Sequence, residues 1–545
     1  MSTFTTRTLL LATAGLLVPG LARAQEQVPS TDSREAATPA PARQPAGGAT
    51  VGDAQATPGD ARPDQGALGD VVVTALRRES RAQRTALAIT AVGGSDLRAR
   101  EITSVENLAP SLPNVNFGKN VGFARIAIRG VGLDTTVAGQ EGRVAYHLDG
   151  VYISRPSAAI SSFFDVNRVE VVRGPQGTLY GRNATAGTVN VITNDPEDRF
   201  GGYGRVTVGN YGTYNFEGAI TGPVSDTVSV RFAFQTNHHD GWGKGLVTGE
   251  DIDNEKDGGF RAKLKWKPSA AFDVVVSGDY FYESDQAFVY HYLGQGNPAV
   301  APFGPRLGGR VAPNPRDSYG EVPQINFRRF YGVGAVANLN LGFATLTSVT
   351  GYRDVNTDYD SDADGTDVNI TNFRIVEQAQ QFSEELRLAG NIGTLKYLLG
   401  GYYFNEGIYG NVAFSPLRQL SNNPVLAQGV DYRGTLKTRA YAGFGQLDWE
   451  VVHGLTLSAG ARYSYETKII DHRGVVDTVT PYNPALPLNY RLFQADQVSF
   501  GSFTPRLGVE FRVQRDILLY ATYAKGFKSG ASASTRSIRR CSPRS

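Results

Sequence analysis

From about residue 200 onward, apolar and polar residues alternate along the chain with a period of two. In residues 228–235, valine or phenylalanine occupies every second position, and serine, arginine, alanine or glutamine lies between them. The same pattern recurs over residues 261–267, 455–465, 506–512 and 517–523. Because successive side chains of a strand point to opposite faces, these segments predict β-strands with one apolar and one polar face. Counted in this way, the chain holds roughly 12 to 14 such strands.

The segments between these strands are of two kinds. Short turns, such as residues 223–226 and 452–454, alternate with long polar stretches, such as residues 288–318 and 354–372. After the signal-like N-terminus, no apolar run approaches the ~20 residues that a membrane-spanning helix needs. Alternating strands with short turns at one end and long loops at the other are typical of outer-membrane barrels. We therefore predict an all-β fold, a transmembrane antiparallel β-barrel, and a soluble β-sandwich with the same alternation stays open as an alternative.

The N-terminal region predicts export. Arg7 precedes an apolar run, and Ala22, Arg23 and Ala24 form a small-x-small cleavage site, so residues 1–24 are typical of a signal peptide. The next stretch, residues 25–69, is rich in alanine, proline, glycine and aspartate and contains almost no large apolar residue. Such a composition buries too little apolar surface to fold, so we expect a disordered periplasmic linker.

An apolar segment interrupts this composition at residues 70–76. Most of its residues are apolar, and the charged residues Arg77, Arg78 and Glu79 follow it. A β-forming segment beside a disordered linker needs a partner strand. Either it adds as a strand to an energising partner protein, or it is the first strand of the following domain. Its residues are Asp70, Val71, Val72, Val73, Thr74, Ala75 and Leu76.

Residues 167–193 form a compact strand, turn and strand unit. The first β-forming run ends at Gly174 and Pro175, which do not continue a central strand. Later glycines, Gly181 among them, allow tight turns before the second β-forming run. With the short helices and strands expected upstream, residues 81–195 predict a small α+β domain.

Three motifs in a fixed order carry a family resemblance. Residues 126–130 read Ile-Ala-Ile-Arg-Gly, residues 148–153 read Leu-Asp-Gly-Val-Tyr-Ile, and the unit at residues 167–193 follows. Together they resemble the plug domain of TonB-dependent outer-membrane receptors. The resemblance implies three parts: a TonB box at residues 70–76, a plug inside the barrel lumen at residues 81–195, and a partial barrel at residues 200–530.

The resemblance also implies a function and a location. The protein would be an energy-coupled receptor in the outer membrane of a Gram-negative bacterium, importing a scarce ligand when TonB rearranges the plug. The implied partners are TonB, acting with ExbB and ExbD at the TonB box, the outer-membrane lipid and a small-molecule ligand. Family analogy favours a ferric siderophore, whereas cobalamin, saccharides and other small molecules stay open.

Two arginines are predicted to form an electrostatic lock between plug and barrel. A buried guanidinium needs a carboxylate, because an unpaired buried charge is costly. The resemblance pairs Arg129 and Arg173 with glutamates on the inner barrel wall, where Glu385 is a candidate partner. Glu170 is a second candidate, within the plug. Alternatively, the two arginines are solvated in a water-filled lumen.

Three plug loops are rich in glycine, serine, threonine and asparagine. If the family topology holds, these loops are the plug apices that meet the ligand from outside. The residues predicted to face the ligand are Phe123, Gln140 and Arg155.

Composition excludes several other functions. The formal net charge of +2 gives no strongly basic surface for nucleic acid, and the single cysteine, Cys541, cannot form an internal disulfide. No nucleophile, base and orienting acid stand in a recognisable arrangement, so we expect neither an enzyme nor a cofactor.

One acidic stretch is a candidate metal site. Asp360, Asp362 and Asp364 place oxygens at positions one, three and five of a calcium-type loop, with Gly365 at position six. Position twelve is Thr371 instead of glutamate, which excludes an EF-hand. A calcium-assisted external loop and a solvated acidic tip both stay open.

The pattern changes near the C-terminal end. Plugged transporters close with about 22 strands, more than the alternation predicts here. Residues 531–545 show no alternation and contain the only cysteine. We therefore expect an incomplete barrel with an aberrant, non-barrel tail, in a chain truncated before the further wall glutamates that the resemblance implies. The alternative function is accordingly a non-functional fragment of such a receptor.

Overall fold

The computed structural model describes residues 72–530, except 79, 82, 84, 101, 103, 121, 134–138, 160–162, 293–302, 369–371, 415–429, 476–491 and 515–516. The described residues belong to one compact unit, Ala67–Ser545. The predicted signal peptide, the linker and the tail lie outside the described residues, as do Asp70 and Val71 of the predicted TonB box.

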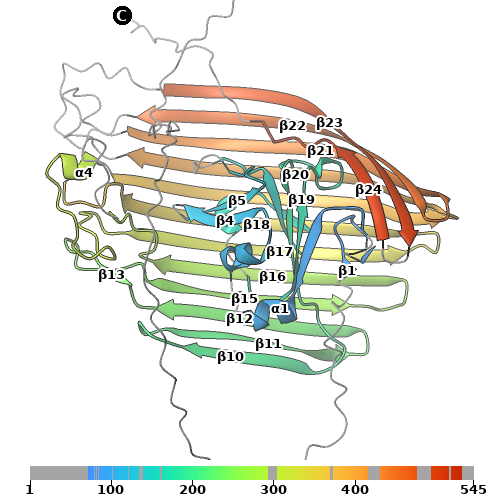
Figure 1. Ribbon diagram of the computed structural model, residues 1–545, viewed down its shortest axis with the longest axis horizontal. Helices are drawn as coiled ribbons and strands as arrows, with labels where there is room; N and C mark the ends of the chain where they lie inside the picture. Colours follow the sequence, from blue (N-terminus) through green and yellow to red (C-terminus); the bar gives the residue numbers. More distant parts are fainter. Residues whose placement is uncertain are drawn as a thin grey trace, which may run out of the picture. The chain divides into compact units, whose positions relative to one another are not determined.

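A single large sheet of 13 antiparallel strands dominates the described chain, and its strands lie side by side in chain order (Figure 1). This number lies within the range predicted from the alternation. In the described part of the chain, β10 and β24 are the edges of the sheet and do not pair with each other. The strands are β10 (Gly201–Val208), β11 (Tyr214–Ser225), β12 (Val228–His239), β15 (Glu255–Trp266), β16 (Phe272–Asp285), β17 (Ile325–Asn340), β18 (Ala344–Asp362), β19 (Asn372–Ile392), β20 (Leu395–Phe414), β21 (Val430–Val452), β22 (Leu455–Val475), β23 (Leu492–Gln514) and β24 (Ile517–Ala524). Loops between them carry β13 (Gly243–Lys244), β14 (Asp251–Ile252) and the helical turn α4 (Phe303–Arg306).

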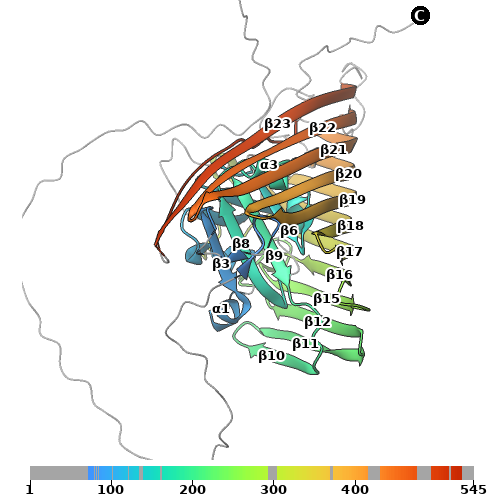
Figure 2. The ribbon, with the colours of Figure 1, turned by 90° about the vertical axis from the view of Figure 1, so that its right-hand side faces the viewer.

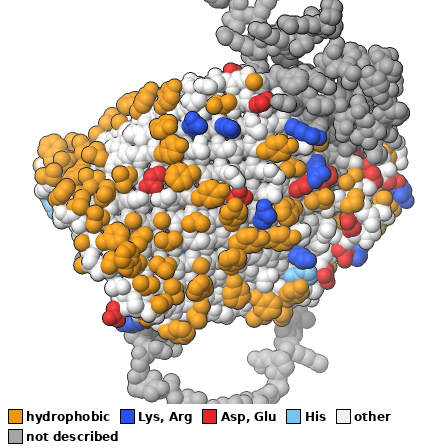
Figure 3. Space-filling model, turned by 180° about the vertical axis from the view of Figure 1, so that it is seen from behind, with side chains coloured by type: hydrophobic (Ala, Val, Ile, Leu, Met, Phe, Trp, Pro, Cys, Tyr) orange, Lys and Arg blue, Asp and Glu red, His pale blue; other side chains and the backbone are white. Residues whose placement is uncertain are grey.

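Strand β12 shows how the alternation separates the two faces of this sheet. Phe232 and Phe234 are 54% and 52% exposed on the outer face, whereas Ser229, Arg231 and Ala233 are buried on the inner face. Seen from outside, apolar and neutral side chains cover most of the sheet, and charged groups are few (Figure 3). An apolar outer face and a polar inner face are what lipid and a polar lumen require. We call the inner face of this sheet the inner wall.

The plug is a small α+β domain built on a five-stranded sheet of order β3-β8-β9-β6-β7. Strands β6 and β9 are parallel, and the other neighbours are antiparallel. Its elements are β3 (Ile89–Gly93), α1 (Gly94–Ala99), α2 (Val105–Leu108), η2 (Ala109–Ser111), β4 (Val115–Asn120), β5 (Phe123–Ile128), β6 (Val144–Leu148), β7 (Val151–Ile153), η3 (Pro156–Ala158), β8 (Val166–Arg173), α3 (Gly177–Tyr180) and β9 (Gly187–Thr193). None of the described helices is long or apolar enough to cross a membrane.

The core of the plug comes from the predicted strand, turn and strand unit. Val169, Val171, Val189 and Val191 are at most 1% exposed and alternate along β8 and β9.

The large sheet curves around the plug, which lies on its inner side (Figure 2). The predicted fold class, an antiparallel membrane barrel with an α+β plug inside, is confirmed, and the described sheet is open.

Two glycines bring the β8–β9 connection against the inner wall. Where the sequence pattern predicts only a turn, the structure has the single helical turn α3 between Gly177 and Gly181. A Cβ at Gly177 would lie 2.6 Å from the carbonyl oxygen of Lys525. At Gly181, where φ is +76°, a Cβ would lie 2.8 Å from Cζ of Arg462. Glycine at these positions therefore permits the close contact between plug and wall.

Candidate functional site

The segment predicted as the TonB box is docked in the structure. Its first two described residues form β1 (Val72–Val73), which pairs with β2 (Ser80–Arg81) in a two-stranded sheet. Val73 and Ala75 are fully buried, and Ala75 packs against the plug residue Val172. The segment does not join the five-stranded plug sheet but pairs with β2 at the start of the plug, so both interpretations of the segment stay predictions. We call residues 72–78 the coupling segment.

Glu170 of β8 holds the coupling segment from the plug side. Its Oε1 accepts hydrogen bonds from the Thr74 backbone N–H at 2.9 Å and from Thr74 Oγ1 at 3.2 Å. The same oxygen pairs with Arg168 Nε at 2.9 Å, and Glu170 has no exposed surface. Because β8 alternates, Glu170 lies on the opposite face from Arg173 and does not pair with it, contrary to the sequence-based expectation.

Two arginines hold the coupling segment to the inner wall. Arg77 Nη2 lies 3.1 Å from Glu385 Oε2 on β19, and both side chains are buried. Arg78 Nη2 lies 2.5 Å from Asp448 Oδ2 on β21. Glu385 is thus a wall carboxylate with an arginine partner, but this partner belongs to the coupling segment and is neither Arg129 nor Arg173 of the plug. The adjacent arginines Arg77 and Arg78 are the sequence feature from which this anchorage could have been predicted. The sequence pattern alone indicates only that they end the apolar run.

Arg129 and Arg173 do not form the predicted lock among the described residues. Arg129 is exposed at a positive φ of 53°, and Arg173 donates a hydrogen bond to Thr90 Oγ1. Partial burial and the nearby charge of Arg129 lower the pKa of Arg173. Neither arginine forms an ion pair within the described part of the chain. Their placement is closer to the alternative of solvated arginines.

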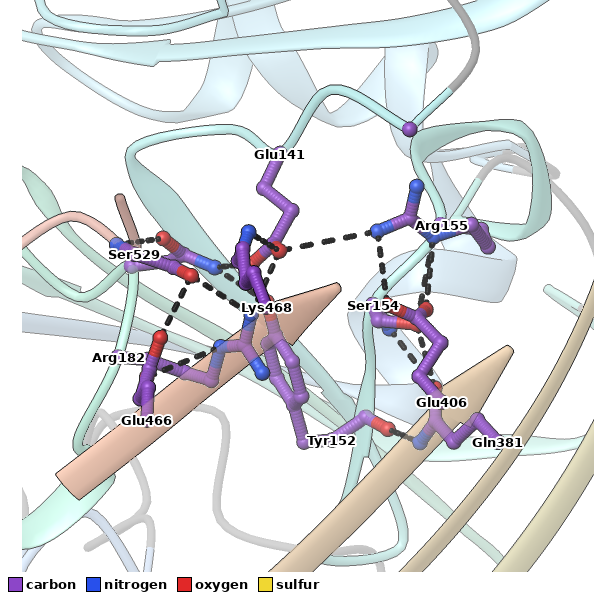
Figure 4. A network of polar contacts seen from close by, with 12 residues as sticks. Glu141, Tyr152, Ser154, Arg155, Arg182, Gln381, Glu406, Glu466, Lys468 and Ser529 are labelled. Atoms are coloured by element: carbon purple, nitrogen blue, oxygen red, sulfur yellow. Dashed lines mark hydrogen bonds and ion pairs between the residues drawn. The ribbon is translucent and has the colours of Figure 1, made fainter. Parts of the chain in front are cut away.

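Arg155 lies in a buried network of charges between plug and wall (Figure 4). It is 1% exposed, and its Nε lies 2.9 Å from Glu406 Oε1 on β20. Its Nη1 lies 3.5 Å from Glu377 Oε2 on β19. Burial would lower the pKa of Arg155, but Glu406, Glu377 and Glu141 raise it. The expectation that Arg155 faces the ligand is wrong in this structure, because the loop after β7 carries its guanidinium onto two wall carboxylates.

The same network continues to Arg182 and β22. Glu141 Oε1 lies 2.5 Å from Arg182 Nη2 and 3.0 Å from Lys468 Nζ. Arg182 Nε lies 3.6 Å from Glu466 Oε1, and Ser529 Oγ donates to Glu466 Oε2 at 2.7 Å. Burial would raise the pKa of the Glu141 carboxyl, but Arg182, Lys468 and Arg155 hold it well below its usual range. The plug is therefore joined to β19, β20 and β22 by charged groups that have little contact with solvent.

Strand β19 presents three of the contacted side chains on one face. Glu377, Gln381 and Glu385 follow one another at intervals of four residues, and all three are buried on the inner wall. Gln381 Oε1 accepts from Ser154 Oγ at 2.6 Å, between the Arg155 contact and the Arg77 contact. At about 3.4 Å per residue, Glu377 and Glu385 lie roughly 27 Å apart along the strand. One strand therefore touches both a predicted apex loop and the coupling segment.

The other two predicted ligand-facing residues differ in their exposure. Phe123 is 4% exposed and belongs to an apolar cluster with Tyr359 and Phe373 of the wall, so it does not face outward as expected. Gln140 is half-buried. A contact between Gln140 and the ligand stays a prediction.

The acidic stretch is built as a hydrogen-bonded turn. Asp360 belongs to β18, which runs to Asp362, so this end of the stretch is strand where a loop was expected. Asp362 Oδ1 accepts from the N–H groups of Asp364 at 2.6 Å and Gly365 at 2.8 Å. Among the described residues, no group of three His, Cys, Asp or Glu is placed to hold a metal ion. The candidate calcium site is therefore not supported, and Thr371 lies outside the described residues.

Two family models match the chain. Residues 81–188 match the TonB-dependent receptor plug domain, and residues 271–539 match the TonB-dependent receptor-like β-barrel. The chain therefore belongs to the TonB-dependent receptors, outer-membrane proteins of Gram-negative bacteria that are receptors and transporters and not enzymes.

Individual relatives cover shorter parts of the sequence. The pesticin receptor of Yersinia pestis is 32% identical over 159 residues, which are 29% of this chain and 23% of that protein. The ferric enterobactin receptor PirA of Pseudomonas aeruginosa is 28% identical over 194 residues, 32% of this chain and 26% of that protein. The vitamin B12 transporter BtuB of Vibrio vulnificus is 30% identical over 140 residues, 24% and 22% of the two chains. The matches thus span about a quarter of the length of these curated relatives.

Solved structures support the fold. The ferric yersiniabactin uptake receptor FyuA from Yersinia pestis superposes with a TM-score of 0.67 at 19% identity, covering 82% of this chain and 65% of that chain. The ferric-catecholate import receptor Fiu from E. coli superposes with a TM-score of 0.63 at 15% identity, covering 82% of this chain and 71% of that chain. At these identities the likeness shows the fold alone.

Proposed function

We propose that this chain acts as an energy-coupled receptor that imports a ferric siderophore, with TonB pulling on the coupling segment. The observation that carries the proposal is the double anchorage of that segment, through Thr74 to Glu170 in the plug and through Arg77 to Glu385 in the wall. A segment held at both sides transmits a pull to each of them.

The anchorage suggests how force would reach the plug. An added strand would bind TonB through backbone hydrogen bonds, and ExbB and ExbD would supply the energy. Glu170 lies on β8 between the buried core residues Val169 and Val171, so a pull on Thr74 acts directly on the central sheet of the plug. Separating Arg77 from Glu385 and Arg78 from Asp448 would release the same segment from the barrel.

The relatives favour iron chelates as ligands. PirA is named as a receptor for ferric enterobactin, and FyuA as an uptake receptor for ferric yersiniabactin. Cobalamin is the second candidate ligand, because the vitamin B12 transporter matches at 30% identity, close to the 32% of the pesticin receptor.

A transport assay with paired ligands tests this proposal. The full chain is expressed in a Gram-negative host that lacks its own siderophore and cobalamin receptors, with and without TonB. We expect uptake of radiolabelled iron from a catecholate or phenolate chelate only when TonB is present. Uptake of labelled cobalamin alone would establish the second candidate, and iron uptake without TonB would refute energy coupling.

A further inference from the structure

A small cavity lies between the plug and the inner wall, beside the coupling segment. Plug residues and residues from β18, β19, β20 and β22 enclose it. Its polar lining includes Arg77, His147, Tyr152, Tyr180, Arg182, Ser383, Glu385, Tyr402 and Arg462.

Positive charge exceeds negative charge around this cavity. Glu385 is shared by two guanidinium groups, Arg77 at 3.1 Å and Arg387 at 2.9 Å. Arg462 is 4% exposed and donates to Ser464 Oγ at 3.0 Å, but no described carboxylate lies within ion-pair distance of it. Burying a guanidinium without a counter-charge is strongly unfavourable. Glu385 and Glu466 attract Arg462 only from beyond that distance, so a further negative charge in the cavity would stabilise its guanidinium group.

The position of Arg462 is built into the fold. Its Cζ lies 5.3 Å from the centre of the Tyr402 ring and 5.1 Å from that of Phe444. Gly181 covers the guanidinium from the plug side, at a distance that leaves no space for a side chain. The charge is thus held at the cavity by packing on both sides.

The imidazole of His147 is a second buried group at the cavity, and one of its nitrogens has no hydrogen-bond partner among the described residues. His147 is 2% exposed, and its ring centre lies 5.1 Å from that of Tyr180. Its Nδ1 has no hydrogen-bond partner among the described residues, and neither has Nε of Arg77. Burial and the charge of Arg77 lower the pKa of His147, so the imidazole is neutral and can donate one hydrogen bond. Arg77 Nε–H is therefore an unpartnered donor, and His147 is a second donor in the tautomer that carries the proton on Nδ1.

We propose that this cavity binds a small inorganic monovalent anion, such as chloride, between Arg462, Arg77 and His147. The cavity admits about one water-sized body, which suits a halide and not a phosphate or a carboxylic acid. The anion would supply the missing negative charge next to Arg77. Halide binding would therefore stabilise the anchored state of the coupling segment.

Anomalous diffraction and thermal unfolding test this site. The full chain is purified in detergent, and crystals are grown with sodium bromide. We expect an anomalous bromide peak in the cavity beside Arg462. We also expect a higher unfolding temperature in sodium chloride or bromide than in sodium gluconate at the same ionic strength. Arg462→Gln should abolish this halide effect.

Arg506→Gln is the matched control, because Arg506 is also a buried arginine on the inner wall, 5% exposed, but does not line the cavity. It should retain the halide effect. If Arg462→Gln does not fold, Arg462→Lys keeps the charge and should retain a weakened effect. A cavity without a bromide peak, or a halide effect that persists unchanged in Arg462→Gln, would overturn the proposal.

Discussion

Arg77 and Glu385 join the coupling segment to the inner wall across 308 positions of sequence, with Nη2 and Oε2 3.1 Å apart. The two residues differ in their number of partners. Glu385 pairs with both Arg77 and Arg387, whereas Arg77 pairs with Glu385 alone among the carboxylates of the described residues. Removing Glu385 should therefore have different consequences from removing Arg77.

We expect Glu385→Gln to destabilise the anchorage more than Arg77→Met. The first change leaves buried guanidinium groups without a carboxylate, a loss of roughly 3–5 kcal/mol for a broken buried pair. The second leaves Glu385 still paired with Arg387. Limited proteolysis of residues 72–78 measures the release, with Arg98→Met on the exposed surface of α1 as the control. Equal release in both variants would contradict the asymmetry.

Replacing Val72 with proline should reduce TonB-dependent uptake to background without weakening ligand binding. Proline removes a backbone N–H from a segment that, in the proposed function, adds as a strand to TonB. Val72 is 45% exposed in β1, so the substitution disturbs little packing. Uptake and equilibrium binding of the same labelled ligand are compared, with Val72→Thr as a control that keeps the N–H. Normal uptake by the proline variant would exclude this segment as the TonB box.

Glu170→Ala should loosen Thr74. The variant removes acceptors of both the backbone N–H and the hydroxyl of Thr74, whereas Thr74→Val removes only the hydroxyl bonds. A lost hydrogen bond to a charged group is worth about 1.5–3 kcal/mol, so exchange of the Thr74 amide should accelerate roughly 10- to 100-fold. Hydrogen exchange followed by mass spectrometry detects this change. The Thr74→Val variant should show a smaller acceleration, and a reversed order would argue against Glu170 as the anchor.

Gly181→Ala should lower the stability of the contact between plug and wall. Both the positive φ of +76° and the 2.8 Å approach to Arg462 oppose a side chain. The backbone strain alone is of order 1–3 kcal/mol. Gly130→Ala is a matched control, because Gly130 has a φ of +77° and a Cβ added there would meet nothing within 4 Å. Thermal unfolding of both variants isolates the clash, and equal losses would show that Arg462 can move aside.

The loop that contains Glu321 should loosen at alkaline pH. Burial and the adjacent Asp362 raise the pKa of Glu321 from 4.5 to about 9. A raised pKa means that this contribution to stability is full below the unfolded value near 4.5 and is lost as pH rises through about 9. The Glu321 backbone N–H, which donates to Asp362 at 3.2 Å, should then exchange faster than intrinsic base catalysis predicts. Glu321→Gln should remove this extra pH dependence.

The local pattern of the sequence was enough to predict the strands and their faces. Period-two alternation sorted residues such as Arg231 and Phe232 onto opposite faces, because side-chain direction in a strand depends only on its neighbours along the chain. The strand, turn and strand unit at residues 167–193 was predicted for the same reason. Its helical turn α3 was not predicted, because contact with the inner wall, which is remote in sequence, helps to shape it.

Only the tertiary structure decided which charges meet. Arg155 and Glu406 are 251 positions apart, and their contact depends on the register of several successive strands and on how the plug lies against them. Each one-residue change of register moves a side chain to the other face, so the sequence pattern alone cannot choose between Arg129, Arg173, Arg155 and Arg77 as partners of the wall. The same geometry buried Phe123 against the wall and placed Glu170 under Thr74. The sequence by itself therefore determined the class of fold and the family, and the three-dimensional packing determined the contacts through which the plug is held.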